Sequence, residues 1–463
     1  MSAPHVSMMG ISNKIGLRVA FGLTTVSLFA AVLLRGGVYT EQWVWSAMGV
    51  SVAGLLVASS GPAEDYPSRK DGVQWLMAAL LVWMVLPLVP LPRAIIAILS
   101  RERWSAISAA REFTGQSPHA WAVLSVAPGA TMERLLDVAP AMAVFLVTRR
   151  LCARWRANAW VLAIPVVAVA WLESALGLLQ LGAMRVAGGE TSVVTGTYVN
   201  RDHFAGLLEM AFPLAALGAV ALWRKSKAHS GSFAWPVLAA VALLGVGGCL
   251  LLGIGFSLSR MGFLATLAAT VLTTGILLVP RTHRFSGRAG WRWFAGVALL
   301  VFLLACLPSS ELLGRFGEMT AGKRISSDAR VGIWSDTLPM VAAYKWVGCG
   351  LGAYQYAFYR FNVHSPMDTV DFAHNDYLQM VAELGSIGAA LVAALALWIA
   401  WRVLSVVLWM PASPNWELAV GILGALFAIG LHGLTDFNLY IPANALVVAW
   451  LSGMADSPGL RRG

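Results

Sequence analysis

The chain has 463 residues, of which 58% are hydrophobic and only 12% are charged, and its mean hydropathy is +0.70. Soluble domains usually carry about 25% charged residues, so this composition excludes a soluble enzyme and a disordered chain. An excess of 33 Lys and Arg over 23 Asp and Glu residues would suit nucleic acid in a soluble protein. In so apolar a chain we interpret it as a membrane-topology signal, and we expect no nucleic-acid partner.

The apolar stretches predict an all-α, polytopic membrane protein with about twelve transmembrane helices. A spanning helix needs about 20 mostly apolar residues. The candidates are 15–34, 43–60, 73–91, 135–149, 158–181, 203–222, 235–256, 261–280, 293–309, 375–401, 417–435 and 440–456. Lys14 and Arg18 precede the first span as in a signal peptide, but no small-residue cleavage region follows it, so we expect this span to be retained.

The basic residues predict that both termini lie in the cytoplasm. With that orientation most Lys and Arg residues of the short loops lie inside, as the positive-inside rule requires. The short outer loops then carry only Arg35, Arg185, Arg201 and Arg260. This orientation places both long loops on the outer side of the membrane.

Two long outer loops elaborate what we predict to be a single membrane domain of residues 1–463. Loop 92–134 begins with alternating apolar and basic residues, which fit a helix on the outer leaflet and a packed loop helix equally well. Loop 310–374, the large periplasmic loop, contains a predicted helix from Asp328 to Tyr344. The Gly-rich residues 348–352 that follow lack the strand–turn–helix context of a phosphate loop, so they favour a tight turn.

Three predicted helices begin at the outer face with unusual polar residues. The residues are Asn200, Arg201, Asp202 and His203 in the sixth span, Ser259 and Arg260 in the eighth, and His374, Asn375 and Asp376 in the tenth. A helix N-terminus presents free N–H groups and a partial positive charge, which suit an anion. The three starts together therefore predict one site for a phosphate-bearing ligand at the outer leaflet.

Some of these residues also have a structural explanation. Asn200, Ser259 and Asn375 are ordinary N-cap residues. Arginine is unfavourable at a helix N-terminus on electrostatic grounds, and its alternative is to reach toward lipid headgroups. We favour anion binding for Arg260, and for Arg201 the two interpretations stay evenly matched.

Acidic residues within the spans extend this polar region. Glu209 and Glu383 lie seven residues after Asp202 and Asp376, which returns each to nearly the same helix face. Carboxylates in a membrane are functional or paired by default. Glu383 falls on the opposite face from His374, so we expect it to bond to neighbouring helices or to an arginine.

Two residues near the end of the eleventh span leave two interpretations open. His432 and Asp436 either complete the site or cap the turn there. No HExxH motif or clustered His pair stands in an exposed loop, and the basic neighbours would repel a cation. We therefore expect no metal and no other cofactor.

Several motifs together resemble the bacterial O-antigen ligase/polymerase family over about residues 195–445. His374-Asn375 followed after nine residues by Gly385-Ser386-Ile387-Gly388 is the most specific of them. The others are Thr195 to Phe204, Ser259-Arg260, Arg330 with Trp334, Gly350 to Tyr354, and Asp436-Phe437-Asn438.

The resemblance implies a polytopic inner-membrane glycosyltransferase with its active site facing the periplasm. Such enzymes transfer a glycan from undecaprenyl diphosphate to lipid A–core, to a growing glycan or to a protein, and the family implies metal-independent, inverting chemistry. It also implies a catalytic histidine at His374 and essential arginines at Arg260 and Arg330. Arg201 has no firm counterpart. The implied partners are the lipid-linked donor, an acceptor glycan or lipid A–core, and membrane lipids; nothing indicates an oligomeric state.

The chemistry gives each residue type a reason. Forked hydrogen bonds from arginine suit the oxygens of a departing diphosphate. A neutral imidazole, which in an unperturbed histidine titrates near about pH 6.5, can remove the acceptor proton, so His374 is the expected general base. We expect Asn200, His203, Asn375 and Asp376 to bind substrate, with Glu209, Glu383 and Asp436 in support.

Three alternatives stay open at this point. A polysaccharide polymerase of the same family would use the same chemistry on another acceptor. A twelve-helix transporter would be expected to show two related halves, and the chain has no visible repeat. A structural scaffold would not need arginine at helix N-termini.

Overall fold

The computed structural model describes residues 5–60, 71–115, 121–188, 193–228, 234–278, 326–364 and 366–461. These residues form an all-helical structure, with one isolated bridge between Leu91 and Ala122. The predicted span 293–309 and the beginning of loop 310–374 lie outside the described residues. The fold class is therefore confirmed as all-α for the described part of the chain.

The longer helices follow the predicted spans closely. They are α1 (His5–Leu33), α2 (Thr40–Ser59), α3 (Gly72–Val85), α6 (Pro128–Arg154), α7 (Ile164–Val186), α8 (Arg201–Ala228), α9 (Ala234–Ser257), α10 (Arg260–Leu278), α15 (Asp376–Trp409), α16 (Trp416–His432) and α17 (Pro442–Asp456). The shorter ones are α4 (Arg93–Leu99), α5 (Arg101–Thr114), α13 (Ser326–Ala343), α14 (Tyr354–Phe358), α18 (Pro458–Arg461) and the 3-10 turns η1 (Arg35–Gly37), η2 (Leu86–Leu88), η3 (Arg156–Leu162) and η4 (Asn438–Tyr440).

Seven stretches of helix among the described residues are long and apolar enough to cross a membrane. They comprise α1, α2, η3 with α7, α8, α9, α10 and α15, and two shorter apolar stretches, Gly72–Leu88 and Trp416–His432, accompany them. The expected count of twelve is not confirmed. Two predicted spans differ for simple reasons: α6 carries charged residues such as Arg149 and Arg150, and α17 has only 15 residues.

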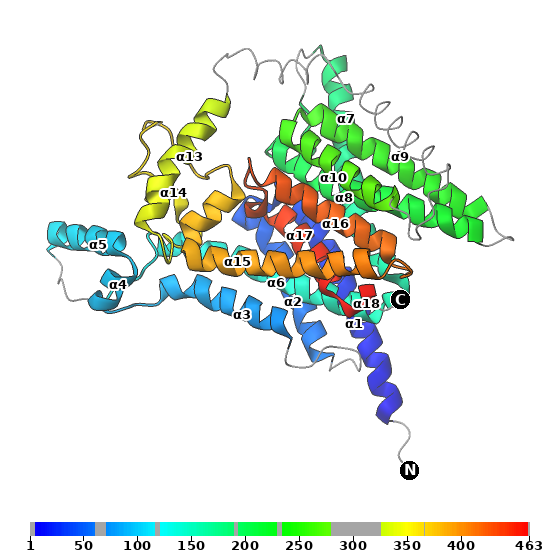
Figure 1. The fold of residues 1–463 in the computed structure, drawn as a ribbon, viewed down its shortest axis with the longest axis horizontal. Helices are drawn as coiled ribbons and strands as arrows, with labels where there is room; N and C mark the ends of the chain where they lie inside the picture. The colour runs from blue at the N-terminus through cyan, green and yellow to red at the C-terminus, as the bar shows by residue number, and fades with distance from the viewer. Residues whose placement is uncertain are drawn as a thin grey trace.

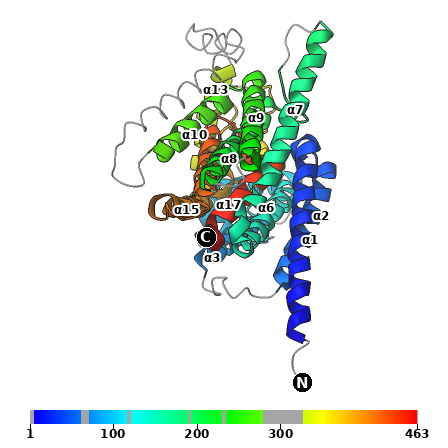
Figure 2. The ribbon, with the colours of Figure 1, turned by 90° about the vertical axis from the view of Figure 1, so that its right-hand side faces the viewer.

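Helix α8 lies at the centre of the bundle, between α9 and α16 (Figure 1). It is the most buried of the seven candidate spans, with 78% of its apolar window inside the protein. Figure 2 shows α1 and α2 on one side of the bundle and α10 and α15 on the other. The main apolar core joins side chains of α1, α6, α7, α8, α16 and α17. Helices from both halves of the chain therefore pack against α8.

The Gly-rich residues 348–352 form the predicted tight turn and fit against a break in α15. Gly348 and Gly352 have positive φ angles, and Gly385 inside α15 has φ 66° and ψ −179°. A Cβ on Gly385 would lie 2.3 Å from the carbonyl oxygen of Trp346. Gly385 breaks the helix, and the amides of Cys349 and Gly350 donate to the carbonyls of Ala382 and Glu383, so this turn fixes the first two turns of α15 against the segment that follows α13.

Helices α4, α5, α13 and α14 gather on one side of the bundle (Figure 1). Helix α13 confirms the helix predicted from Asp328, and the indole N–H of Trp334 donates to the carbonyl of Ala373 at 2.8 Å. Helix α5 confirms a helix in loop 92–134, with Ile107 buried and Phe113 93% exposed. Its placement on the outer leaflet stays a prediction.

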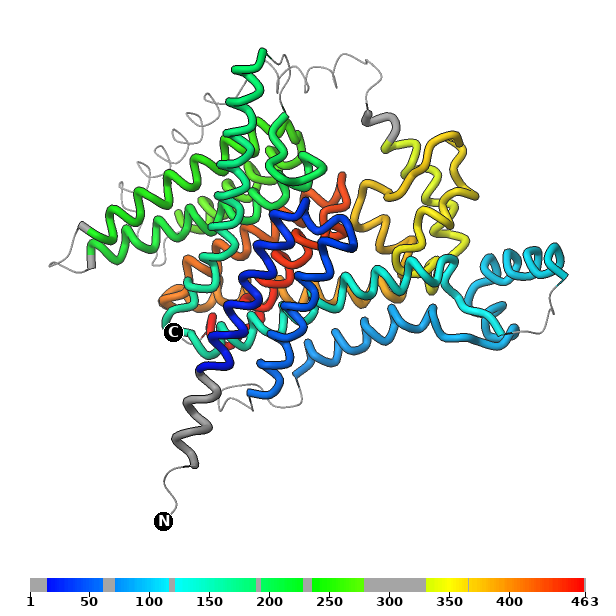
Figure 3. The backbone as a smooth tube through the Cα atoms, turned by 180° about the vertical axis from the view of Figure 1, so that it is seen from behind, coloured from blue at the N-terminus to red at the C-terminus, as the bar shows by residue number. Residues whose placement is uncertain are grey.

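The C-terminal ends of α6 and α17 meet in an ionic cluster. Figure 3 shows α6 running from the side of α4, α5, α13 and α14 toward the C-terminus. There Arg149 pairs with Asp71 and with Asp456, and Arg402 pairs with Asp456 at 2.8 Å. Buried ion pairs of this kind are costly unless fully paired, so the cluster fixes how α3, α6, α15 and α17 meet far from the polar helix starts.

Candidate functional site

The polar residues at three helix starts act as N-caps, as their types predict. Asn200 Oδ1 accepts the amide of Asp202 at 2.8 Å, and Ser259 Oγ accepts the amide of Gly262 at 3.2 Å. Asn375 Oδ1 accepts two amides at 3.0 Å, from the second and third residues of α15. Such caps satisfy N–H groups that would otherwise lack partners, so α8, α10 and α15 begin where the sequence indicates.

The three helix starts are held close together by packing. A Cβ on Gly262, in the first turn of α10, would lie 2.6 Å from Cβ of Ala205 in the first turn of α8. The amide of Asp376, at the start of α15, donates to the carbonyls of Gly433 and Asp436 in the turn after α16. The side chain of Asp436, in that turn, lies 3.8 Å from His203 of α8.

Asp436 lies between two histidines at this junction. Its Oδ1 atom is 3.5 Å from Nδ1 of His374 and 3.8 Å from Nε2 of His203. The ring of Phe437 packs edge-on to both imidazoles, with centroids 4.9 Å from His374 and 4.7 Å from His203. The carboxylate of Asp436 therefore links His203, in the first turn of α8, to His374, two residues before α15.

The charge of Asp436 is stabilised despite its burial. The side chain is only 1% exposed, and burial by itself would raise its pKa, but the two imidazoles beside it hold the pKa well below the ordinary value of an aspartate. His374 is 33% exposed and is the open member of the pair. Asp436 thus remains an acceptor for an imidazole N–H over the mildly acidic and neutral range.

A second histidine–carboxylate pair lies beneath the first. Nδ1 of His432 is 3.1 Å from both carboxylate oxygens of Glu209, and both side chains are buried. Glu209, which was predicted to lie on the same helix face as Asp202, thus has His432 of α16 as its partner. His432 and Asp436 both lie in this polar cluster, and Asp436 also accepts the amide of Phe437 within the turn. That they complete a substrate site stays a prediction.

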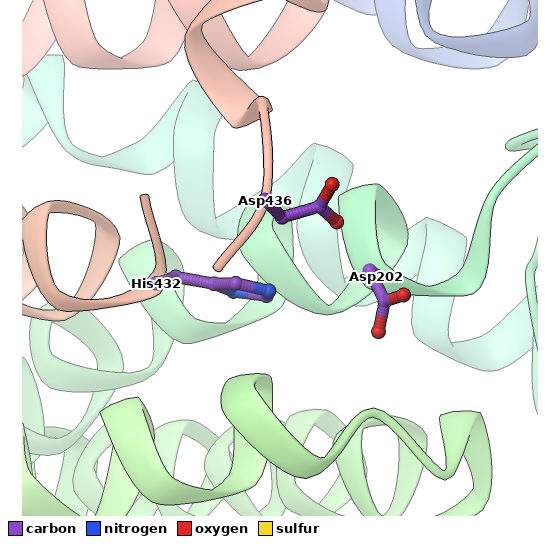
Figure 4. A group of neighbouring side chains, drawn as sticks. All are labelled: Asp202, His432 and Asp436. Carbon is purple, nitrogen blue, oxygen red and sulfur yellow. The ribbon is translucent and has the colours of Figure 1, made fainter. Parts of the chain in front are cut away.

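Asp202, His432 and Asp436 also form a group that could hold a cation (Figure 4). They offer one ligand atom each within 4.8 Å of one another. The oxygens suit a hard divalent ion and the imidazole a transition metal. His432 bonds Glu209 through Nδ1, which leaves Nε2 available for a ligand. Spacing along the chain did not predict this group, because Asp202 lies on α8 while His432 and Asp436 lie at the end of α16 and in the turn after it. The expectation of a metal-free site stays a prediction.

The three arginines lie at or beside the helix starts. Arg330, on α13, has Nη2 3.9 Å from Oδ2 of Asp202, and its side chain is 31% exposed. Arg260 and Arg201 are the first residues of α10 and α8, and both are partly exposed. The structure thus brings Arg330, His203 and His374 to one carboxylate-lined junction, and it brings Arg260 to the neighbouring helix start.

Glu383 has a different environment from the rest of the site. Its carboxylate accepts hydrogen bonds from Gln379, from the hydroxyl of Tyr440 at 2.8 Å and from the amide of Gly352. Bonding to neighbouring elements was expected, and these partners leave the group satisfied and buried. We interpret Glu383 as the residue that ties the Gly-rich turn to α15.

Asn444 is a site-supporting residue that the sequence analysis missed. It accepts from the hydroxyl of Tyr198 at 3.0 Å and donates to the backbone oxygen of His203 and to Asn438. Its position as a polar residue within the predicted span 440–456 was the available signal. It holds the segment that precedes α8 against α17.

Backbone strain is concentrated at the same helix starts. Among the described residues only Arg35, Leu258 and His374 are non-glycine residues with positive φ, at 56°, 55° and 49°. Leu258 directly precedes Ser259, and His374 directly precedes Asn375. Strained residues of this kind persist where surrounding contacts fix them, often at functional sites.

The family model described as O-antigen ligase matches residues 245–393. The match confirms the resemblance to the O-antigen ligase family over this segment, which runs from within α9 to within α15 and contains Arg260, Arg330 and His374. It indicates ligase- or polymerase-type glycosyl transfer by a protein with several membrane helices. The comparison with curated proteins gave no significant match.

Proposed function

We propose that the protein transfers a glycan from undecaprenyl diphosphate to an acceptor hydroxyl on the periplasmic face, in the manner of an O-antigen ligase. The observation that carries the proposal is the contact between His374 and Asp436 at the junction of the capped helix starts, with Arg330 beside it. This junction combines a proton acceptor with donors for an anion. The family match over residues 245–393 supports the same reaction class.

Arg330, Arg260 and the helix N-termini meet the charge of the departing diphosphate. As the bond between the anomeric carbon and the diphosphate oxygen breaks, negative charge grows on that oxygen. A preorganised donor at developing charge is worth roughly 3–4 kcal/mol in catalysis. The guanidinium of Arg330 is partly exposed and lies 3.9 Å from the carboxylate of Asp202. Because this contact is long, a phosphate can bind the guanidinium in place of Asp202 while α13 stays folded.

His374 acts as the general base. Its Nδ1 faces Asp436, so a proton on Nδ1 leaves Nε2 free to accept one from the acceptor hydroxyl. The deprotonated oxygen then attacks the anomeric carbon from the side opposite the diphosphate, which inverts its configuration. Asp436 stabilises the imidazolium that forms, and the proton leaves to solvent through the exposed part of His374.

The test is a transfer assay with the purified protein in lipid nanodiscs. The donor is an undecaprenyl-diphosphate-linked glycan, and lipid A–core and a non-reducing glycan end are offered as separate acceptors, each with and without EDTA. Transfer to lipid A–core in EDTA supports the proposal, whereas lengthening of the glycan alone assigns a polymerase. Strict dependence on an added divalent ion would overturn the metal-free mechanism and make Asp202, His432 and Asp436 the first ligands to test by substitution.

A further inference from the structure

A cavity lies between α14 and the segment that leads to His374. Its volume is about 410 Å³, and its polar lining consists of Gln355, Tyr356, Tyr359, Asn362, Asp368 and Thr369. None of these residues belongs to the candidate site described above. The cavity therefore needs an explanation of its own.

Two tyrosines of this lining are unusually exposed. The side chain of Tyr356 is 58% exposed and that of Tyr359 is 76% exposed. Neither hydroxyl has a hydrogen-bond partner among the residues that the structure describes. A ring with an apolar face and a polar tip suits a ligand that is itself amphipathic.

The rest of the lining matches the hydroxyl groups of a sugar. Gln355 offers amide donors and an acceptor, Thr369 offers a hydroxyl, and the carboxylate of Asp368 is a strong acceptor. Asn362 lines the same cavity and donates to the backbone oxygen of Asp368 at 3.2 Å. A pyranose ring presents C–H groups on its faces and hydroxyls around its rim. Tyrosine faces with amide and carboxylate groups around them are complementary to both.

The charge of the cavity selects against an anionic ligand. No Lys or Arg lines it, and its one ionisable carboxyl is Asp368. The nearest basic residue along the chain, Arg360, pairs with Glu102. A phosphate or a uronic acid would meet an unmatched carboxylate here, whereas an uncharged sugar would not.

The cavity is also held in shape before any ligand arrives. Tyr354, on α14, hydrogen bonds to Thr337 at 2.7 Å and stacks on Phe358 with centroids 5.1 Å apart. On the other side, the carboxylate of Asp336 accepts the amides of Val363 and His364 at 2.8 and 2.9 Å. A preorganised site loses less entropy on binding, as a weakly bound glycan requires.

We propose that this cavity binds uncharged pyranose residues of the glycan and so holds the chain beside the reacting end. The inference rests on the proposed function for the identity of the glycan. The geometric link is direct: the segment that lines the cavity continues to Ala373, which Trp334 of the Arg330-bearing helix anchors, and then to His374.

The experiment measures oligosaccharide binding without turnover. The protein is held in lipid nanodiscs, because sugar-headed detergents would compete for the cavity. The probes are tetrasaccharides of glucose, galactose, mannose and N-acetylglucosamine, with tetragalacturonate as the acidic counterpart, and binding is followed by saturation-transfer NMR. We expect at least one uncharged tetrasaccharide to bind and the acidic one not to bind.

The variants separate a sugar site from a general surface effect. Tyr356→Ala with Tyr359→Ala should weaken binding about tenfold or more, whereas the double Phe variant keeps the rings and should bind within about twofold of wild type. Val363→Ala is the matched control, because its side chain is 75% exposed on the same loop outside the cavity lining. Absence of binding by every uncharged probe, or equal binding by the double Ala variant, would overturn the inference.

Transfer assays on the same variants keep this inference separate from the proposed function. An increase in KM for the donor alone assigns the cavity to the donor glycan, and an increase for the acceptor alone assigns it to the acceptor. If the protein transfers glycan but binds no tetrasaccharide, the proposed sugar site is refuted and the proposed reaction is not. If the wild-type protein binds a tetrasaccharide but transfers no glycan, the proposed reaction is refuted and the sugar site is not.

Discussion

Oδ1 of Asp436 lies 3.5 Å from Nδ1 of His374. In the chain, His374 precedes α15 and Asp436 follows α16, so the contact closes the α15–α16 hairpin. The partner of the histidine is thus an aspartate beyond the end of α16, while Glu383, in the helix that follows His374, accepts from Tyr440 instead. This contact is the basis of the first prediction.

Asp436→Asn is expected to lower the transfer rate by about 100-fold or more, because the amide cannot stabilise an imidazolium or fix its tautomer. The rate is measured in the nanodisc assay, with donor binding measured separately and expected to persist. Asp371→Asn is the control, since that side chain is an exposed aspartate on the segment that leads to His374. A fully active Asp436→Asn protein would refute the positioning role.

His374→Ala is expected to bind the lipid-linked donor but to transfer no glycan, because the acceptor proton then has no base. In the wild type the rate should fall once the pH is low enough to protonate the imidazole, since a protonated imidazole cannot accept a proton. Asp436 stays charged under mildly acidic conditions, because its pKa is held well below the ordinary aspartate value. A flat pH–rate profile would count against His374 as the base.

Arg330→Ala and Arg260→Ala are each expected to reduce turnover by about 100-fold or more. Lysine at either position should rescue poorly, because a point charge lacks the forked geometry of a guanidinium. The comparison is the turnover number at saturating donor, with Arg101→Ala on the exposed helix α5 as a charge-matched control. If the two Lys variants work as well as wild type, the bidentate contact is not what the reaction requires.

Gly385→Ala is expected to destabilise the protein by roughly 3 kcal/mol or more. Its φ of 66° disfavours a side chain, and the new Cβ would lie 2.3 Å from a backbone oxygen of Trp346. Gly182→Ala in α7 is the matched control, because nothing lies within 4 Å of its Cβ position. Thermal unfolding in nanodiscs compares the two; equal melting temperatures would show that the turn can move away from α15.

Asp336 is expected to fix the loop at 363–364 in a pH-dependent way. Burial opposes its charge, but hydrogen bonds from the backbone and ring of His364 and from the amide of Val363 lower its pKa. Because the folded pKa is the lower one, the stabilisation is complete above the ordinary aspartate value of about 3.9 and is lost as pH falls below it. Hydrogen exchange at Val363 and His364 should therefore accelerate at neutral pH in Asp336→Asn, and unchanged protection would contradict this role.

Much of the architecture follows from local sequence. The apolar stretches predicted all-α structure, and Asn200, Ser259 and Asn375 predicted where three helices begin, because a cap acts within one turn of its own helix. The Gly-rich run predicted a turn for the same local reason. The count of spans was less accessible, since α6 and α17 are helices whose charge or length does not fit a simple apolar span.

By itself, then, the sequence determined the helical class, the capped helix starts and the gathering of Arg, His and Asp residues at them. Only the tertiary structure decided that His374 faces Asp436, that His432 pairs with Glu209 and that Gly385 breaks α15 against the Gly-rich turn. Such pairings join residues from different helices, and their energy depends on how the helices pack and exclude water. Spacing along one helix carries no information about that arrangement.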